Sequence, residues 1–492
     1  MSDLPRSRVQ LAVTAAASMA VGCWLLRRYL VRRGKAEDAS SGASSSGVGR
    51  ELPCMSHSHY EGCIYMDYNA TTPVFPEVAA VMEPFTRSCF GNPSSPHVFA
   101  APCREAIRVA RQHVAALINC SDEGCIIFTS CGTESDNMAI NVALRRRLSG
   151  NAPSQQGPPN VVSCATEHPA VLVYLETLAA RGEISLTVLP VDDQGFVSPA
   201  AVSAALQPNT ALCTIMHSNN ETGTIQPLRE IGRAVAKYNA ATPGANVLLH
   251  SDAAQSLGKG VLIDVEAMGV HMLTVVGHKF GAPKGVAALY VQAGLHADPM
   301  LVGGGQERGR RAGTENVLLI AALGEASRLA RAEAGPMLLH LLSLKRRLIS
   351  KLQAGLGQGK AKLRFNGPRR SVDPAEIDSD LGLLRVILRG GGGASSPAST
   401  SLVLEQLPNT VSVSFQGVRV HQLMPLLVRR VACSAGSACH ADSTQASPVL
   451  RAMHVPDDFA LGTLRLSFGR HTSEREIDDA ASRVISAVKS LC

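Results

Sequence analysis

The chain has 492 residues, of which 45% are hydrophobic and 18% are charged, so most of it is expected to fold rather than stay disordered. This length allows one large α/β domain and a smaller one. The formal net charge of +7 lies largely before residue 36, so the rest of the chain predicts no nucleic-acid partner. Thirteen cysteines scattered through apolar runs favour free thiols over a disulfide framework.

An uncharged stretch near the N-terminus, residues 9–26, is moderately hydrophobic and at the lower length limit for a membrane span. It is compatible with a membrane anchor, with an Arg- and Ala-rich organelle presequence, or with a loosely helical extension. More Lys and Arg follow it than precede it, so an anchored chain would keep its catalytic body in the cytosol. We therefore expect a cytosolic or cytosol-facing protein, with a mitochondrial location as the alternative.

The residues after this N-terminal segment (1–35) form a Ser- and Gly-rich stretch, 36–61, which is typical of a flexible linker. A second low-complexity tract, 390–400, is predicted to be a surface loop. Around the end of the linker stand four residues of the types that bind zinc, but no compact finger surrounds them, so no metal site is predicted. These four residues are Cys54, His57, His59 and Cys63.

Short apolar runs alternate with periodic helical stretches such as 104–118 and 228–238 along the rest of the chain. Near-continuous apolar strands of this kind are typical of a parallel sheet that is buried on both faces. Ligands of such sheets bind at the carboxyl ends of the strands. The predicted strands are 125–129, 160–163, 211–216, 247–250 and 272–276.

Polar residues follow three of these strands at the points where chemistry is expected. The turn 129–137 leads into an apolar helix and would direct backbone N–H groups at an anion. Asp252 follows one strand and Lys279 follows the next, so both would reach the same crevice. Together they indicate a pyridoxal-phosphate site, in which the lysine forms a Schiff base, the carboxylate pairs with the pyridinium nitrogen, and the helix N-terminus holds the phosphate.

A series of ordered motifs adds a resemblance to this interpretation. The chain resembles the class V aminotransferase family over roughly residues 62–490, in its branch of cysteine desulfurases and selenocysteine lyases. The motifs that carry the resemblance are Tyr65–Pro73, Gly91–Ser95, Thr129–Ser135, Thr166–His168, Asn219–Gly223, Asp252–Gln255, Gly277–Lys279, Gly303–Arg308, Gly313–Asn316, Gly436–Cys439 and Leu464–Arg470.

The resemblance implies the α/β fold of fold-type I pyridoxal-phosphate enzymes, assembled as a homodimer. The large cofactor-binding domain would span 62–320 around a mostly parallel sheet of the seven-stranded type, and its first residues would pack with the small domain. The small α+β domain would span 321–492 and carry the loop of Cys439.

The resemblance also implies roles for individual residues. Lys279 would hold pyridoxal 5′-phosphate as a Schiff base, His168 would stack on its ring, and Asp252 would pair with the ring nitrogen. Arg465 would bind the substrate carboxylate in a bidentate pair. The remaining expected contacts are to the phosphate from Gly132, Thr133, His278 and, from the other subunit, Thr314, and to the ring hydroxyl and the substrate side of the cofactor from Gln255 and Asn220.

Cys439 lies among small residues that suit a mobile loop, and the resemblance makes it the residue that receives the chalcogen. Lys279, Cys439 and His168 are therefore the expected catalytic residues. Val276 before Gly-His-Lys is similar to selenocysteine lyases, so we expect release of selenium from L-selenocysteine, with L-alanine as the other product. The alternative is a cysteine desulfurase. Pro169, after His168, departs from animal selenocysteine lyases. A selenium or sulfur acceptor protein is the expected partner.

Overall fold

The computed structural model describes residues 62–149, 157–357, 362–369, 404–436 and 445–492, and residues 62–492 form one compact unit. The segment 1–35, the linker 36–61 and the tract 390–400 lie outside the described residues, so the anchor, the linker and the cellular location stay predictions. Within the described ranges no helix is long and apolar enough to cross a membrane. No group of three or more potential metal-ligating side chains occurs there, and Cys54, His57 and His59 lie outside it.

The largest sheet has seven strands in the order β2-β8-β7-β6-β5-β3-β4. Neighbouring strands from β4 to β7 pair in parallel, and only β8 runs in the opposite direction. The mostly parallel seven-stranded sheet predicted from the sequence is therefore confirmed. The strands are β2 (Ile126–Thr129), β3 (Asn160–Cys164), β4 (Ser185–Leu189), β5 (Thr210–Thr214), β6 (Leu248–Asp252), β7 (Met272–Val276) and β8 (Ala287–Val291).

Alternate residues of these strands bury their side chains on opposite faces of the sheet, as strand geometry requires. Val161, Leu212 and Leu248 belong to a core that includes residues of α4 (Gly132–Ser149) and α5 (Pro169–Ala180). The next residue of each strand belongs to a second core, against α3 (Ala101–Leu117), α7 (Leu228–Ala241) and α9 (Val317–Ala332). Helices therefore cover both faces, which leaves the strand ends as the open edge of the sheet.

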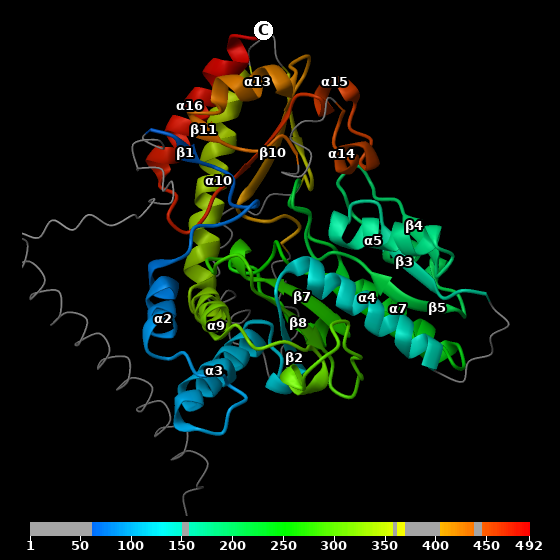
Figure 1. Cartoon of the computed structure of the whole chain (residues 1–492). Coiled ribbons are helices and arrows are strands. Elements are labelled where there is room, and N and C mark those ends of the chain that lie inside the picture. The colour runs from blue at the N-terminus through cyan, green and yellow to red at the C-terminus, as the bar shows by residue number, and fades with distance from the viewer. Residues whose placement is uncertain (1–61, 150–156, 358–361, 370–403, 437–444) are drawn as a thin grey trace, which may run out of the picture. The chain divides into compact units, whose positions relative to one another are not determined.

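A third core lies around two smaller sheets in the C-terminal part of the chain. One is antiparallel, with the order β12-β10-β9, and the other pairs β1 with β11 in parallel. The 23-residue helix α10 (Ala334–Leu356) runs from α9 to this region (Figure 1). Ile64 and Met66 belong to the same core, although they start the described chain. The division at residue 320 stays a prediction. The strands are β1 (Ile64–Tyr65), β9 (Leu363–Asn366), β10 (Thr410–Phe415), β11 (Val431–Ala432) and β12 (Thr463–Ser467).

All five strands predicted from the sequence are present, within two residues at each end, and both named helices are present as α3 and α7. Strands β4 and β8 were not predicted. The other described helices are α2 (Pro76–Arg87), α6 (Pro199–Ala205), α8 (Val265–Met268), α13 (Val420–Leu427), α14 (Pro448–Ala452), α15 (Asp457–Ala460) and α16 (Glu474–Lys489), with short 3₁₀ turns η2 (Val98–Ala100), η3 (Glu123–Cys125), η5 (Gly277–Lys279) and η6 (Gln306–Gly309).

Candidate active site

A cavity of about 280 Å³ opens at the carboxyl ends of the central strands. Strands β6 and β7 are parallel neighbours with Asp252 opposite Thr274, so the residues that follow them reach the same space. Helix α4 and the loops after β3 and β5 complete the walls. Nine residues predicted from the sequence line this cavity: Gly132, Thr133, His168, Asn220, Asp252, Gln255, His278, Lys279 and Arg465.

Asp252 is the last residue of β6, and its carboxylate is buried. The carboxylate accepts a hydrogen bond of 2.9 Å from the backbone N–H of Ala254. Burial raises the pKa of Asp252, while the charges of His168 and Lys279 oppose that rise. A buried carboxylate is stable as an anion only beside a cation. The cavity floor therefore favours a ligand that brings a positive charge to Asp252.

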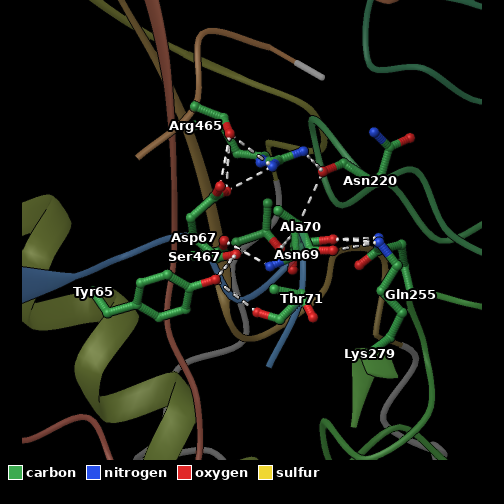
Figure 2. A network of polar contacts seen from close by, with 12 residues as sticks. Tyr65, Asp67, Asn69, Ala70, Thr71, Asn220, Gln255, Lys279, Arg465 and Ser467 are labelled. Carbon is green, nitrogen blue, oxygen red and sulfur yellow. Dashed lines mark hydrogen bonds and ion pairs between the residues drawn. The ribbon is translucent and has the colours of Figure 1, made fainter. Parts of the chain in front are cut away.

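Lys279 ends the 3₁₀ turn η5, directly after β7. Its Nζ donates hydrogen bonds of 2.9 Å to the backbone oxygens of both Asn69 and Ala70 (Figure 2). These carbonyls come from the extended segment after β1, more than two hundred residues away in the sequence. The amine is thereby held at the wall of the cavity, within reach of a ligand.

His168 is the N-cap residue of α5, and its Nδ1 accepts a hydrogen bond of 3.1 Å from the N–H of Ala170. A neutral imidazole that accepts at Nδ1 carries its proton on Nε2. Burial lowers the pKa of His168, which favours this neutral form. Pro169 is the first residue of α5, where its fixed φ suits a helix start. Its departure from animal selenocysteine lyases therefore has a local structural reason.

The N-terminus of α4 packs closely against the end of β7. A Cβ atom on Gly132 would lie only 2.8 Å from Cγ2 of Val276, so this approach requires glycine. The side chain of His278 completes this end of the cavity, with its Nδ1 3.1 Å from Oγ1 of Thr71. Burial and the nearby Lys279 lower the pKa of His278 to about 4. Backbone N–H groups at the start of an 18-residue helix form a binding site for phosphate.

Arg465 lies on β12 and is only 2% exposed. Its Nη2 pairs with the Asp67 carboxylate at 2.7 Å, and its Nη1 donates to the backbone oxygen of Asn220 at 3.1 Å (Figure 2). Ser434 bridges the pair, because its hydroxyl contacts both Asp67 and Arg465. The Nε–H of Arg465 is buried and has no hydrogen-bond partner among the described residues. The described contacts use three of the five N–H donors of the guanidinium, so Arg465, which lines the cavity, keeps donors for a ligand.

Thr314 is exposed and does not line the cavity, and the prediction for Cys439 lies outside the described residues. Asn69, Asp136, Met216 and Ser218 line the cavity without having been predicted to do so. Asn69 lies in the quoted motif Tyr65–Pro73 and Asp136 in the turn 129–137, so each of these motifs contains a cavity residue that was not singled out from the sequence. Asp67, which holds Arg465, lies in the first of these motifs.

These residues fit pyridoxal 5′-phosphate. Asp252 needs a cation, which the protonated ring nitrogen supplies, and the close-packed N-terminus of α4 suits the phosphate. Lys279 supplies an amine for the aldehyde carbon. The neutral His168 offers a flat ring without a charge.

Fold and cavity together define a fold-type I enzyme that uses pyridoxal phosphate. The chain belongs to the class V aminotransferase family, because the model of that family, described as aminotransferase class-V, matches residues 64–368. The predictions of the family, of the fold class, of pyridoxal phosphate as cofactor and of an enzyme that depends on it are confirmed.

Several relatives match most of the chain. A cysteine desulfurase of Trichormus azollae is 37% identical over 416 residues, which is 84% of this chain and 90% of that protein. The cysteine desulfurase NifS of Azotobacter vinelandii is 36% identical over 87% of this chain and 93% of its own length. A solved structure of a NifS-like protein has a TM-score of 0.71 and 29% identity, and covers 87% of this chain and all of that one.

Burial of His250 predicts a specific dependence of stability on pH. This fully buried side chain lies on β6, with Nδ1 2.9 Å from Oγ1 of Thr214 and Nε2 3.1 Å from Oγ1 of Thr274. Burial lowers its pKa to about 3, whereas an unfolded histidine titrates near pH 6.5. The unfolded chain therefore binds one more proton between these values, and the stability that the neutral His250 provides is lost as the pH falls through this window.

We expect the free energy of unfolding of the wild type to fall by about 1.4 kcal/mol per pH unit more than that of His250→Gln between pH 6 and pH 4. Urea unfolding at fixed protein concentration measures both slopes. His296→Gln is the matched control, because the His296 side chain is 85% exposed and its replacement should leave the wild-type slope unchanged. Equal slopes for the wild type and His250→Gln would contradict the prediction.

Proposed function

We propose that this enzyme is a cysteine desulfurase, which removes sulfur from L-cysteine and releases L-alanine. The observation that carries the proposal is the convergence of Lys279, Asp252, His168 and Arg465 on one cavity. Relatives that match 84–87% of the chain and are named cysteine desulfurases support it. They favour sulfur over the selenium chemistry that we expected first from Val276.

Pyridoxal phosphate supplies a ring that takes up the electrons left when a proton leaves the α-carbon of the substrate. Asp252 keeps the ring nitrogen protonated, because a buried carboxylate strongly favours a cationic neighbour. The neutral His168 would offer the ring a flat face and leave this charge balance unchanged. Lys279 would hold the cofactor, and its Nζ would accept the α-proton of the substrate.

Recognition of the amino-acid substrate is assigned to Arg465. Arg465 lines the cavity with donors that its described partners leave unused, and a guanidinium binds a carboxylate in a planar, charge-assisted geometry. Asp67 compensates most of the charge of Arg465 before the substrate binds. This partial compensation favours reversible binding over a permanently trapped carboxylate.

Cys439 is assigned as the sulfur acceptor. Its thiolate attacks the substrate sulfur, a new S–S bond forms as the C–S bond breaks, and the electron pair of the C–S bond stays on the substrate carbon that becomes the methyl group of alanine. The resulting persulfide would pass its outer sulfur to the thiol of an acceptor protein. Gly436, which precedes Cys439, supports this assignment because it lies close to Glu221 of the motif Asn219–Gly223.

We also propose that the enzyme is a homodimer. Large apolar side chains are exposed between α2 and α3: Val98 on η2 is 79% exposed, and Phe90 stacks on Phe99 at a centroid distance of 5.8 Å although both are exposed. Burial of such a patch against a second copy would stabilise the pair. Thr314, which is exposed in one subunit, would then be available to the cavity of the other.

Selenocysteine lyase remains the second candidate. Val276 packs against Gly132 and presents no hydroxyl group at the phosphate end, which is the feature that resembles selenocysteine lyases. A selenol ionises more readily than a thiol and its bond to carbon is weaker. A site that stabilises the transition state for cysteine only weakly can therefore favour selenocysteine. A hundredfold preference needs only about 2.7 kcal/mol of difference between the two transition-state free energies.

Replacement of Lys279 tests the cofactor assignment. We expect Lys279→Ala to lose the visible absorbance that borohydride removes from the wild type, because no amine remains to bond the cofactor aldehyde. Lys284→Ala is the control, since Lys284 is exposed five residues further along and should keep both the absorbance and its reduction. An adduct in Lys279→Ala that borohydride still reduces would refute the role of Lys279.

Replacement of Cys439 tests the transfer step. Cys439→Ala should lower kcat for alanine release by a factor of about 10³ or more, because the nucleophile is removed, while cysteine binding through Arg465 persists. Cys131→Ala is the control, since Cys131 also lines the cavity but is given no catalytic role. Normal turnover in Cys439→Ala, or a comparable loss in Cys131→Ala, would exclude Cys439 as the specific acceptor.

A direct comparison of substrates decides between sulfur and selenium. Alanine release from L-cysteine and from L-selenocysteine, measured under reducing conditions, gives kcat/KM for each. We expect efficient turnover of cysteine, with a ratio of the two values below about one hundred. No alanine from cysteine, together with fast release from selenocysteine, would place the enzyme with the selenocysteine lyases.

A further inference from the structure

Lys259 is a second buried lysine beside the site, and the proposed function gives it no role. It follows β6 on the loop that begins at Asp252, and only 4% of it is exposed. Its Nζ donates hydrogen bonds to Oε1 of Gln255 at 2.7 Å and to Oδ1 of Asn69 at 3.0 Å. Lys259 and Lys279 also line one small cavity of about 20 Å³, so the two side chains approach the same region.

The amine of Lys259 has no acidic partner among the residues that the structure describes. Burial lowers its pKa well below the usual range, and the positive charges of Lys279 and Arg465 lower it further. A neutral amine has two N–H donors, and the two amide oxygens of Gln255 and Asn69 accept from it. The hydrogen bonding of Lys259 is thus complete without a charge, which suits its position beside two cationic groups.

The hydrogen bond from Lys259 determines which way the Gln255 amide points, and at Asn69 it acts together with a hydrogen bond of 3.1 Å from Nδ2 of Asn409 to Oδ1. Because Oε1 of Gln255 accepts from Lys259, its Nε2 is directed to the backbone oxygen of Asn69, at 2.9 Å. Because Oδ1 of Asn69 accepts from Lys259, its Nδ2 donates to the backbone oxygen of Asn220 at 3.1 Å and to Thr410 at 2.8 Å. Figure 2 shows Asn69 near the centre of the site, with Asn220, Gln255 and Lys279 on one side of it.

We propose that Lys259 is a positioning residue of the cofactor site: its amine orients the Gln255 amide and holds Asn69, whose backbone carbonyl accepts from Lys279. The effect reaches the cofactor through Gln255 and Asn69, since Lys259 is not among the residues that line the larger cavity. The proposal rests on the proposed function only in taking Lys279 as the cofactor lysine. Loss of Lys259 leaves Oε1 of Gln255 without a donor among the described residues, whereas Oδ1 of Asn69 still accepts from Asn409. A buried acceptor without a donor costs a factor of about ten in an equilibrium.

The chain contains a matched control for this experiment. Lys345 is also buried, on α10, and donates to Oε1 of Gln406 at 2.6 Å and to the backbone oxygen of Leu407 at 2.9 Å. Burial lowers its pKa to about 7. It follows Leu344 of the third core in α10 and does not line the cofactor cavity. Lys345→Met therefore removes the same kind of hydrogen bonds without touching the network of Asn69.

The test compares Lys259→Met with Lys345→Met. Equilibrium dialysis of each apoenzyme against pyridoxal phosphate should show about tenfold weaker binding for Lys259→Met and binding within twofold of the wild type for Lys345→Met. In the loaded enzyme, Lys259→Met should lower kcat for alanine release while KM for cysteine changes less than threefold, because Arg465 is untouched. Lys259→Gln, which keeps two N–H donors, should recover part of the affinity and serves if the methionine variant does not fold.

A double-mutant cycle with Gln255→Leu separates positioning from a loss of general stability. If Lys259 acts through Gln255, then Lys259→Met should weaken cofactor binding by less than threefold in the Gln255→Leu background. Unchanged affinity in Lys259→Met, an equal loss in Lys345→Met, or a full tenfold loss in the Gln255→Leu background would overturn the proposal. If instead Lys279→Ala keeps its adduct, the assignment of Lys279 fails, while the dialysis and the cycle still decide whether Lys259 orients Gln255.

Discussion

The ion pair between Arg465 and Asp67 joins the two ends of the described chain at the cofactor cavity, across 398 residues of sequence. A guanidinium that is 2% exposed needs a charged partner, and here that partner lies on the segment after β1. The pair thereby holds the backbone of Asn69 and Ala70 where Lys279 can donate to both carbonyls. The cofactor lysine of the large sheet thus depends on a contact made by β12 of a smaller one.

Two kinds of structure therefore build the site. The parallel sheet places Asp252 and Lys279 at neighbouring strand ends through its topology alone. Local sequence patterns predict such strands and the residues that follow them. The segment after β1 and the strand β12 supply the residues that orient them. This second set works through single long-range contacts, and each depends on a buried polar group finding one matching partner.

This difference explains how much of the site could be predicted. Asp252 and Lys279 were predicted because apolar strands followed by polar residues form a local pattern. Asp67 and Lys259 were missed because a carboxylate and a lysine in a sequence are more often surface residues, and only the fold buries them. Strand β4 was missed because its residues are mostly half-exposed and lack a clear alternation. Strand β8 is fully buried and its apolar run could have been identified.

Three buried carboxyl groups lie at or beside the cavity: Asp136 and Asp252 line it, and Glu167 directly precedes the lining residue His168. Burial raises the pKa of each, to about 8 for Glu167, and the charge of Asp252 raises the pKa of the other two further. A positive charge on His168 or Lys279 lowers the pKa of Asp252, whereas no cation among the described residues counteracts the rise at Asp136 or Glu167. Asp252 is thus the carboxyl of the three that ionises most readily, and a pKa of about 8 keeps Glu167 protonated at neutral pH. A protonated Glu167 still accepts from the N–H of Met216 at 2.6 Å, so it positions the wall without a charge that would compete for the ring nitrogen.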